Sequence, residues 1–402
     1  MNLTRSEKAP AGAFLHSSAG VLIAAVVVGA VFFWAYRLGD SGSQGRALAF
    51  SLLSGAFFGL ILQRSRFCFL CITRDFFDRR DARGLLGLVA ALAIGTLGYH
   101  AVFGAFLPIP GPGRLPAGAH IGPVSWVLAV GAFVFGIGMA VSGSCISAHL
   151  YRLGEGASGS PFALLGAALG FVLGFLSWNT LYLGAIQEAP VAWLPHYVGY
   201  GGSLLIQLGV LGAIAWGLWR VHRSDHQALE GERGTLRALL FGQRWPAYVG
   251  GILVGALGVI AYFRSAPLGV TAELGSIART GAQKVSLLPS RLEGLDTFAG
   301  CATVIKEALF SPNGIFITGL VLAAWASALV AGDFRLRRLT WADLGRNLLG
   351  GVLMGWGAMV SLGCTVGVLL SGVMAGAASG WVFGVFCFGG VWLGLQVRRR
   401  LG

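Results

Sequence analysis

The chain has 402 residues, of which 55% are hydrophobic and only 11% charged, with 64 glycines and a formal net charge of +13. Because a soluble domain has about a quarter charged residues, this composition excludes an ordinary cytosolic enzyme, and a disordered chain would not contain so many large aliphatic residues. We predict an all-helical, polytopic integral membrane protein and interpret the basic residues as markers of membrane topology, not as nucleic-acid ligands.

Ten apolar runs approach the length that crosses a bilayer, since a hydrocarbon core of roughly 30 Å takes about 20 helical residues. Several of them are short or interrupted by glycine, which is typical of helices that break inside a membrane. The runs are 18–38, 48–62, 84–107, 124–142, 159–182, 200–220, 245–263, 313–331, 342–362 and 380–397.

Three arginine-rich loops between these runs are predicted to face the cytoplasm. With an even number of crossings, the basic residues near both ends place both termini there as well. The loop at 183–199 has no Lys or Arg, as an outer loop should. The basic residues of these three loops and of the two ends are Arg5 and Lys8; Arg64, Arg66, Arg74, Arg79, Arg80 and Arg83; Arg220, Arg223, Arg233, Arg237 and Arg244; Arg335, Arg337, Arg338 and Arg346; and Arg398, Arg399 and Arg400.

The sequence contains an internal repeat, which many transporters have. Its two halves are 1–199 (core 48–182) and 200–402 (core 245–397). In the charge-derived topology the matched helices run in opposite directions, so we expect inverted, pseudo-symmetric repeats. The segment 283–312 has no counterpart and is expected to be an extramembrane or re-entrant insertion on the outer side. The matched residues are Gly136, Gly138, Val141, Ser142 and Cys145 with Gly355, Gly357, Val360, Ser361 and Cys364, and more loosely Gly55 and Gly59 with Gly251 and Gly255.

Two segments rich in Gly and Ser, 142–159 and 361–379, separate apolar runs and are predicted to be re-entrant. Cys145 and Cys364 stand near their starts. Backbone N–H groups at a helix N-terminus favour an anion, and a thiol is a weak, polarizable donor that suits a soft atom such as sulfur. This pattern does not by itself name a ligand.

The other cysteines give weaker signals. Cys68 and Cys71 have the spacing of a redox pair or half a metal site, but no βαβ setting and no second ligand pair accompanies them. We interpret Cys68 as a thiol in a third buried turn, and Cys301 and Cys387 as small buried hydrophobic residues. No metal and no cofactor is predicted.

Three charged residues near the spans need partners, because an intramembrane charge is costly. Arg152 and Glu155 have helical spacing, which favours a structural pairing of the two with each other, and a part in gating is the alternative. Glu273 either lines the path or marks a loop.

Three segments resemble the YeeE/YedE family of sulfur-transport membrane proteins: RSRFCFLCITRDFF, GMAVSGSCISAHLYRLGEG and GAMVSLGCTVGVLLSG. The resemblance implies a pseudo-symmetric membrane protein that takes up thiosulfate, with the family's buried thiols falling on Cys68, Cys145 and Cys364. Some members of that family work with a TusA-type sulfur carrier or a rhodanese, so any such partner of this chain is expected to be a separate cytoplasmic protein.

The primary hypothesis is therefore a bacterial inner-membrane transporter, not an enzyme, that imports thiosulfate past neutral thiols. The backbone amides of Gly143, Ser144, Gly363 and Thr365 are expected to stabilise the anion. Two alternatives remain open: a transporter of a selenium compound or another sulfur species, and a membrane sulfurtransferase whose cysteine carries a persulfide to a carrier.

Overall fold

The computed structural model describes residues 18–111, 113–223, 244–298, 305–306, 311–336 and 338–401, and within these ranges the regular elements are helices. Nine of these helices are long and apolar enough to cross a membrane, or up to ten if one bent pair counts as a span, which confirms the predicted all-helical membrane architecture. The long helices are α1 (Ser18–Gly39), α2 (Gly42–Ser65), α4 (Arg83–Phe106), α5 (Trp126–Ser142), α7 (Ser160–Leu181), α8 (Leu194–Val221), α9 (Ala247–Arg264), α11 (Pro312–Ala331), α12 (Trp341–Val360) and α14 (Ala378–Leu401).

Local sequence fixes where several of these helices begin. The Ser125 hydroxyl accepts a hydrogen bond from the Leu128 amide at the start of α5, and Ser311 does the same for Gly314 ahead of α11. Thr340 and Asp343 form a reciprocal capping box at the start of α12. Each cap satisfies backbone N–H groups that have no partner inside the helix.

Four long helices end at a break and are followed by a short helix, so the predicted re-entrant segments contain helix as well as turn. Two short helices belong to the first half of the chain, and three belong to the second, where two of them follow the same long helix. They are α3 (Phe69–Arg79) after α2, α6 (Ile146–Gly154) after α5, α10 (Thr271–Lys284) after α9, and the π-helix η5 (Thr365–Ser371) with α13 (Gly372–Met374) after α12.

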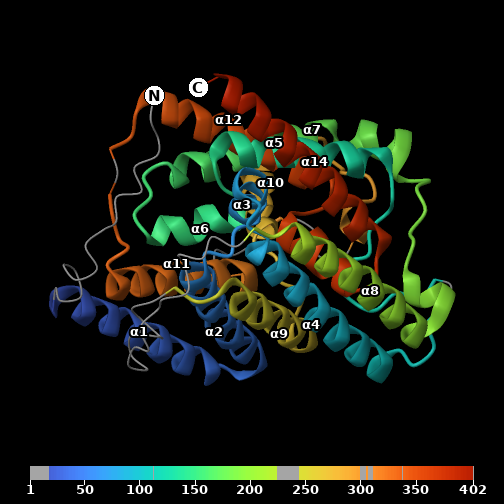
Figure 1. Cartoon of the computed structure of the whole chain (residues 1–402), viewed down its shortest axis with the longest axis horizontal. Coiled ribbons are helices and arrows are strands. Elements are labelled where there is room, and N and C mark those ends of the chain that lie inside the picture. The colour runs from blue at the N-terminus through green and yellow to red at the C-terminus, as the bar shows by residue number, and fades with distance from the viewer. Residues whose placement is uncertain are drawn as a thin grey trace.

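The long helices form two groups, and the short helices lie between them (Figure 1). In one group α2 packs on α11 and α4 packs on α9; in the other α5 packs on α14 and α12 packs on both α7 and α5. Among the short helices, α6 contacts α7 of one group and α11 of the other, while α3 contacts α4 and α14. Each group therefore contains helices from both halves of the chain, and the short helices are held at the centre.

Matched glycines allow matched helices to approach closely. A Cβ atom at Gly55 or Gly59 would collide with the backbone of α11 at Phe316 or Leu320. A Cβ atom at the corresponding Gly251 or Gly255 would collide with the backbone of α4 at Gly87 or Ala91. The loosely matched glycines thus have the same packing role, although the inverted orientation of the two halves stays a prediction.

The predicted cytoplasmic loops meet on one side of the molecule, which we call the basic face. The backbone N–H of Arg223 donates to the Arg80 carbonyl (3.2 Å), and that of Trp245 donates to the Arg64 carbonyl (3.1 Å). The N–H of Arg335 donates to the Glu155 carbonyl (2.9 Å). Loops far apart in the sequence thus share one face.

The segment expected to be an insertion is described only in part. Trp178 and Asn179, at the end of α7, donate hydrogen bonds to the carbonyls of Glu293 and Arg291 (2.8 and 2.9 Å), so this part lies against α7. Residues 299–304 and 307–310, with Cys301, lie outside the described residues, as do Arg5, Lys8, Arg233, Arg237 and Arg337. Cys387 is fully buried in α14, as expected of a small hydrophobic residue.

Candidate functional site: a thiol pair between two short helices

The central feature is a pair of cysteines that are 77 positions apart in the chain. Cys68 and Cys145 are both buried (0% and 1% exposed), and their Sγ atoms lie 3.8 Å apart. Each is the N-cap residue of a short helix, Cys68 of α3 and Cys145 of α6. We call these two residues the thiol pair. The structure thus brings together two of the three predicted cysteines.

The thiol pair lies where two helix N-termini converge. The helices α3 and α6 have 11 and 9 residues, so each has a full first turn of N–H groups without partners inside the helix. Such N-termini carry partial positive charge and favour an anion. Between them the two thiols offer polarizable S–H donors and the Ser147 hydroxyl lies 3.2 Å from the Cys145 sulfur.

The matched breaks have the same construction. The hydroxyls of Ser142 and Ser361 each donate to the carbonyl two residues further on, at Ser144 (3.1 Å) and Gly363 (3.2 Å). Two non-glycine residues at breaks, Arg66 (φ 48°) and Leu362 (φ 61°), adopt the left-handed conformation. Such a conformation is costly outside glycine and is concentrated at functional sites.

The predicted anion-binding amides fall into two kinds. The N–H of Gly143 donates to the Met139 carbonyl (2.8 Å), and that of Gly363 donates to the Ala358 carbonyl (2.7 Å). These two groups close the preceding helices in this conformation, so an anion would have to compete with a carbonyl for them. The amides of Ser144 and Thr365 are the better candidates, and the predicted role of all four stays a prediction.

A small central cavity lies beside the thiol pair. It has a volume of about 20 Å³, and its polar lining comes from Cys145 and Ser147 of the first half and Thr365 of the second. Cys364 precedes Thr365 and is buried (1% exposed), but it is not among the described residues that line this cavity. The volume is enough for about one water molecule. The cavity is therefore too small to hold a larger ion in this conformation.

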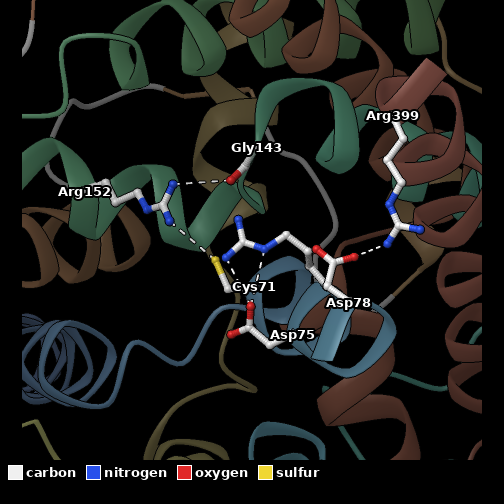
Figure 2. Close-up of polar contacts among 7 residues, drawn as sticks. Cys71, Asp75, Asp78, Gly143, Arg152 and Arg399 are labelled. Atoms are coloured by element: carbon white, nitrogen blue, oxygen red, sulfur yellow. Dashed lines mark hydrogen bonds and ion pairs between the residues drawn. The ribbon is translucent and has the colours of Figure 1, made fainter. Parts of the chain in front are cut away.

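The predicted pairing of Arg152 with Glu155 is wrong. The Arg152 guanidinium donates to the Gly143 carbonyl (3.3 Å) and to the Cys71 sulfur (3.4 Å), as Figure 2 shows. Glu155 instead lies 3.8 Å from the Arg66 guanidinium. Helical spacing allows contact between residues three apart, but here the breaks bring other partners closer.

A polar network on the basic face was missed by sequence reasoning. Gln63 is 1% exposed and donates to the carboxylates of Glu155 (3.3 Å) and Asp333 (3.1 Å), while Ser327 donates to the Gln63 carbonyl (2.7 Å). Arg66 lies 3.7 Å from Asp333. The signal available in the sequence was a glutamine within an apolar helix, which costs free energy unless it is hydrogen-bonded.

Glu273 lines a separate cavity of about 290 Å³ between α2, α9, α10 and α11. Its carboxylate accepts a hydrogen bond from Ser311 (2.7 Å) and forms an ion pair with Lys306. The central cavity and this one have no lining residue in common.

Comparison with known proteins decides the family. A family model described as sulphur transport matches residues 64–393, which contain the thiol pair, Cys364 and all four breaks. The chain belongs to the sulphur-transport (YeeE/YedE) family. Two members similar to it are thiosulfate transporters named TsuA. The one from Escherichia coli K12 is 28% identical over 358 residues, covering 85% of this chain and 92% of that protein. The one from Spirochaeta thermophila is 30% identical over 362 residues, covering 85% and 96%.

Proposed function

We propose that the chain imports thiosulfate, or a closely similar sulfur anion, into the cytoplasm of a bacterium across the inner membrane. The observation that carries the proposal is the thiol pair, which places the N-termini of α3 and α6 close together. Thiosulfate is a dianion whose charge is shared between a soft terminal sulfur and three oxygens. The thiols of Cys68 and Cys145 suit the sulfur, and the helix N-termini suit the negative charge.

In this proposal the thiols act as neutral donors that the ion passes. A thiolate would repel a dianion, and the apolar lining of the central cavity, with Phe58, Phe67 and Phe69, favours the uncharged form. The thiol of Cys364, at the start of η5, donates a hydrogen bond to the ion on the other side of the cavity. Passage needs the breaks to move, because a cavity of about 20 Å³ does not admit the ion.

The orientation is part of the same proposal. The arginine-rich loops of the basic face lie in the cytoplasm with both termini, and the two halves form inverted repeats. The exchange of packing partners between α2–α11 and α9–α4 supports this relation. A cytoplasmic sulfur carrier of the TusA type, or a rhodanese, would take up the delivered sulfur at this face.

The contacts around Cys145 favour passage over covalent chemistry. An enzyme that forms a persulfide needs a base that takes the proton from its thiol. His149 is the nearest such residue in the sequence, but its two ring nitrogens contact the hydroxyls of Ser142 (3.2 Å) and Ser160 (3.3 Å). We therefore propose a transporter without an enzymatic step.

The test is uptake of thiosulfate labelled in its outer sulfur by cells without their own uptake systems. Wild type is compared at matched expression with Cys68→Ala, Cys145→Ser and Cys364→Ala. Cys387→Ala is the control, because Cys387 is equally buried in α14 and is not among the cavity residues. Loss in the three variants and retention in the control support the proposal. If wild-type cells took up selenite instead, the proposed substrate would be wrong. Labelled persulfide on Cys145 would show that the ion reacts with the thiol and does not only pass it.

A further inference from the structure

The guanidinium of Arg152 lies next to the thiol pair and has no ionic partner among the residues that the structure describes. Arg152 follows Cys145 by two helical turns, and its side chain extends back along α6 toward the helix N-terminus, as helical side chains do. It thereby lies between the break at Gly143 and the first turn of α3 at Cys71, which Figure 2 shows.

The partners of Arg152 are weak for a guanidinium. One acceptor is the neutral Gly143 carbonyl at 3.3 Å, and the other is the Cys71 sulfur at 3.4 Å. Within the described part of the chain, Arg152 takes part in no ion pair closer than 4.0 Å. The nearby Arg74, by contrast, contacts the Asp75 carboxylate at 3.2 Å. A planar guanidinium with such acceptors can exchange them for two oxygens of an oxyanion.

A second unsatisfied group lies at the same break. The Ser144 side chain is 0% exposed, and its hydroxyl has no hydrogen-bond partner among the described residues. It stands between Gly143, which binds Arg152, and Cys145 of the thiol pair. A buried hydroxyl without a partner costs free energy, so it indicates a ligand that completes the site.

We propose that Arg152, with Cys71 and Ser144, forms a second station for the anion, next to the thiol pair and toward the basic face. The guanidinium takes two oxygens of the sulfonate end in place of the Gly143 carbonyl and the Cys71 thiol. Neutral thiols give a dianion no countercharge, and Arg152 supplies it. Cys71 is half-buried whereas Cys68 and Cys145 are buried, so the station lies nearer the aqueous side. The inference rests on the proposed function, because it names the residue that selects the charge of the transported species.

The first test is the concentration dependence of thiosulfate uptake by Arg152→Gln and Arg152→Lys. Arg74→Gln is the matched control, because it removes the same charge from a residue of α3 that already has a carboxylate partner. We expect the KM of Arg152→Gln to rise roughly ten- to a hundredfold, because this factor corresponds to the loss of one hydrogen bond to a charged group. Arg152→Lys should lie between this variant and wild type, because it keeps the charge but loses the fork.

In the same test the KM of Arg74→Gln should stay within about twofold of wild type, as for a partly exposed ion pair. The unfolding midpoints of the purified proteins separate loss of binding from loss of folding. An Arg152→Gln protein that folds normally and transports with wild-type KM overturns the inference.

The second test does not need transport. Cys71 is the only described cysteine that is not buried, so in a Cys301→Ser background it is the thiol that methanethiosulfonate reagents should modify. The Cys71 thiolate displaces methanesulfinate and forms a mixed disulfide. We expect the ratio of the modification rate of the anionic reagent to that of the cationic reagent to be higher in wild type than in Arg152→Gln. Thiosulfate should slow the modification.

The two tests separate the inference from the proposed function. If the reagent ratio does not change with Arg152 and thiosulfate gives no protection, the station is wrong even if uptake is normal. If thiosulfate protects Cys71 but wild-type cells take none up, the anion site stands and the proposed import fails.

Discussion

The Sγ atom of Cys68 lies 3.8 Å from the Sγ atom of Cys145, although the two residues belong to different broken helices. Two thiols in contact, each at a helix N-terminus, form one site and not two. Residues that act as a unit have non-additive effects on function.

We therefore expect the double variant Cys68→Ala with Cys145→Ser to lose no more thiosulfate uptake than the more impaired single variant. The measurement is initial uptake rate at matched expression, analysed as a double-mutant cycle. The double variant of Cys145→Ser with Cys387→Ala gives the comparison. The effects of these two separate sites on the uptake rate should multiply, which means that their free-energy effects add. Multiplicative losses for Cys68 and Cys145 would show that they act independently.

A second prediction concerns the glycines at the contact of α12 with α7. A Cβ atom at Gly355 would collide with the backbone of Ala167, so Gly355→Ala must separate the two helices. We expect a loss of about 1–3 kcal/mol in the free energy of unfolding, despite the higher helix propensity of alanine. Gly209→Ala is the control, because no other described part of the chain comes within 4 Å of a Cβ at that position of α8, and it should be neutral or stabilising. Thermal unfolding in detergent measures both, and equal midpoints for the two variants would contradict the packing argument.

The long helices could be predicted from the sequence, whereas the contacts at their breaks could not. The apolar run 313–331 becomes α11 at Pro312–Ala331 because span length and the Ser311 cap are both local signals. The repeat around Cys145 and Cys364 identified two breaks, because its matched residues can also be read from the sequence alone. The contact of Arg152 with Cys71, by contrast, depends on how α6 and α3 pack across the bundle, and no local pattern encodes it.

A third prediction concerns pH and the loop between α3 and α4. Two guanidinium N–H groups of Arg83 donate to the Asp81 carboxylate (2.9 and 2.7 Å), and its backbone N–H does so as well (3.0 Å), which holds the pKa of Asp81 below its usual value. A lowered folded-state pKa gives stability that is present above the unfolded pKa of about 3.9 and is lost as pH falls through the folded value. Because both side chains are partly exposed, we expect less than about 1 kcal/mol.

Asp81→Asn should thus lower the unfolding midpoint slightly at pH 7, and the difference from wild type should disappear in acid below the folded pKa. Glu188→Gln, which removes an exposed carboxylate from another loop, controls for net charge. A difference that persists unchanged at low pH would mean that the charge of Asp81 has no part in it.

The fourth prediction concerns Gln63, whose amide joins two carboxylates on the basic face. Its Nε2 donates to Glu155 and Asp333, and its Oε1 accepts from Ser327, so every part of this buried amide is used. Gln63→Met leaves both carboxylates without this donor, and we expect a loss of about 2–4 kcal/mol. Gln63→Glu should be worse, because it adds a third carboxylate between the two.

Two further variants make this prediction specific. Asp333→Asn should partly rescue Gln63→Glu, because it removes one negative charge and returns an N–H donor to the same place. Gln207 is the control, as it is equally buried (1% exposed) in α8 but neither atom of its amide has a hydrogen-bond partner among the described residues. Gln207→Met should therefore leave the unfolding midpoint unchanged or raise it. If Gln63→Met and Gln207→Met had the same effect, burial alone and not the hydrogen-bonded network would determine the stability of this face.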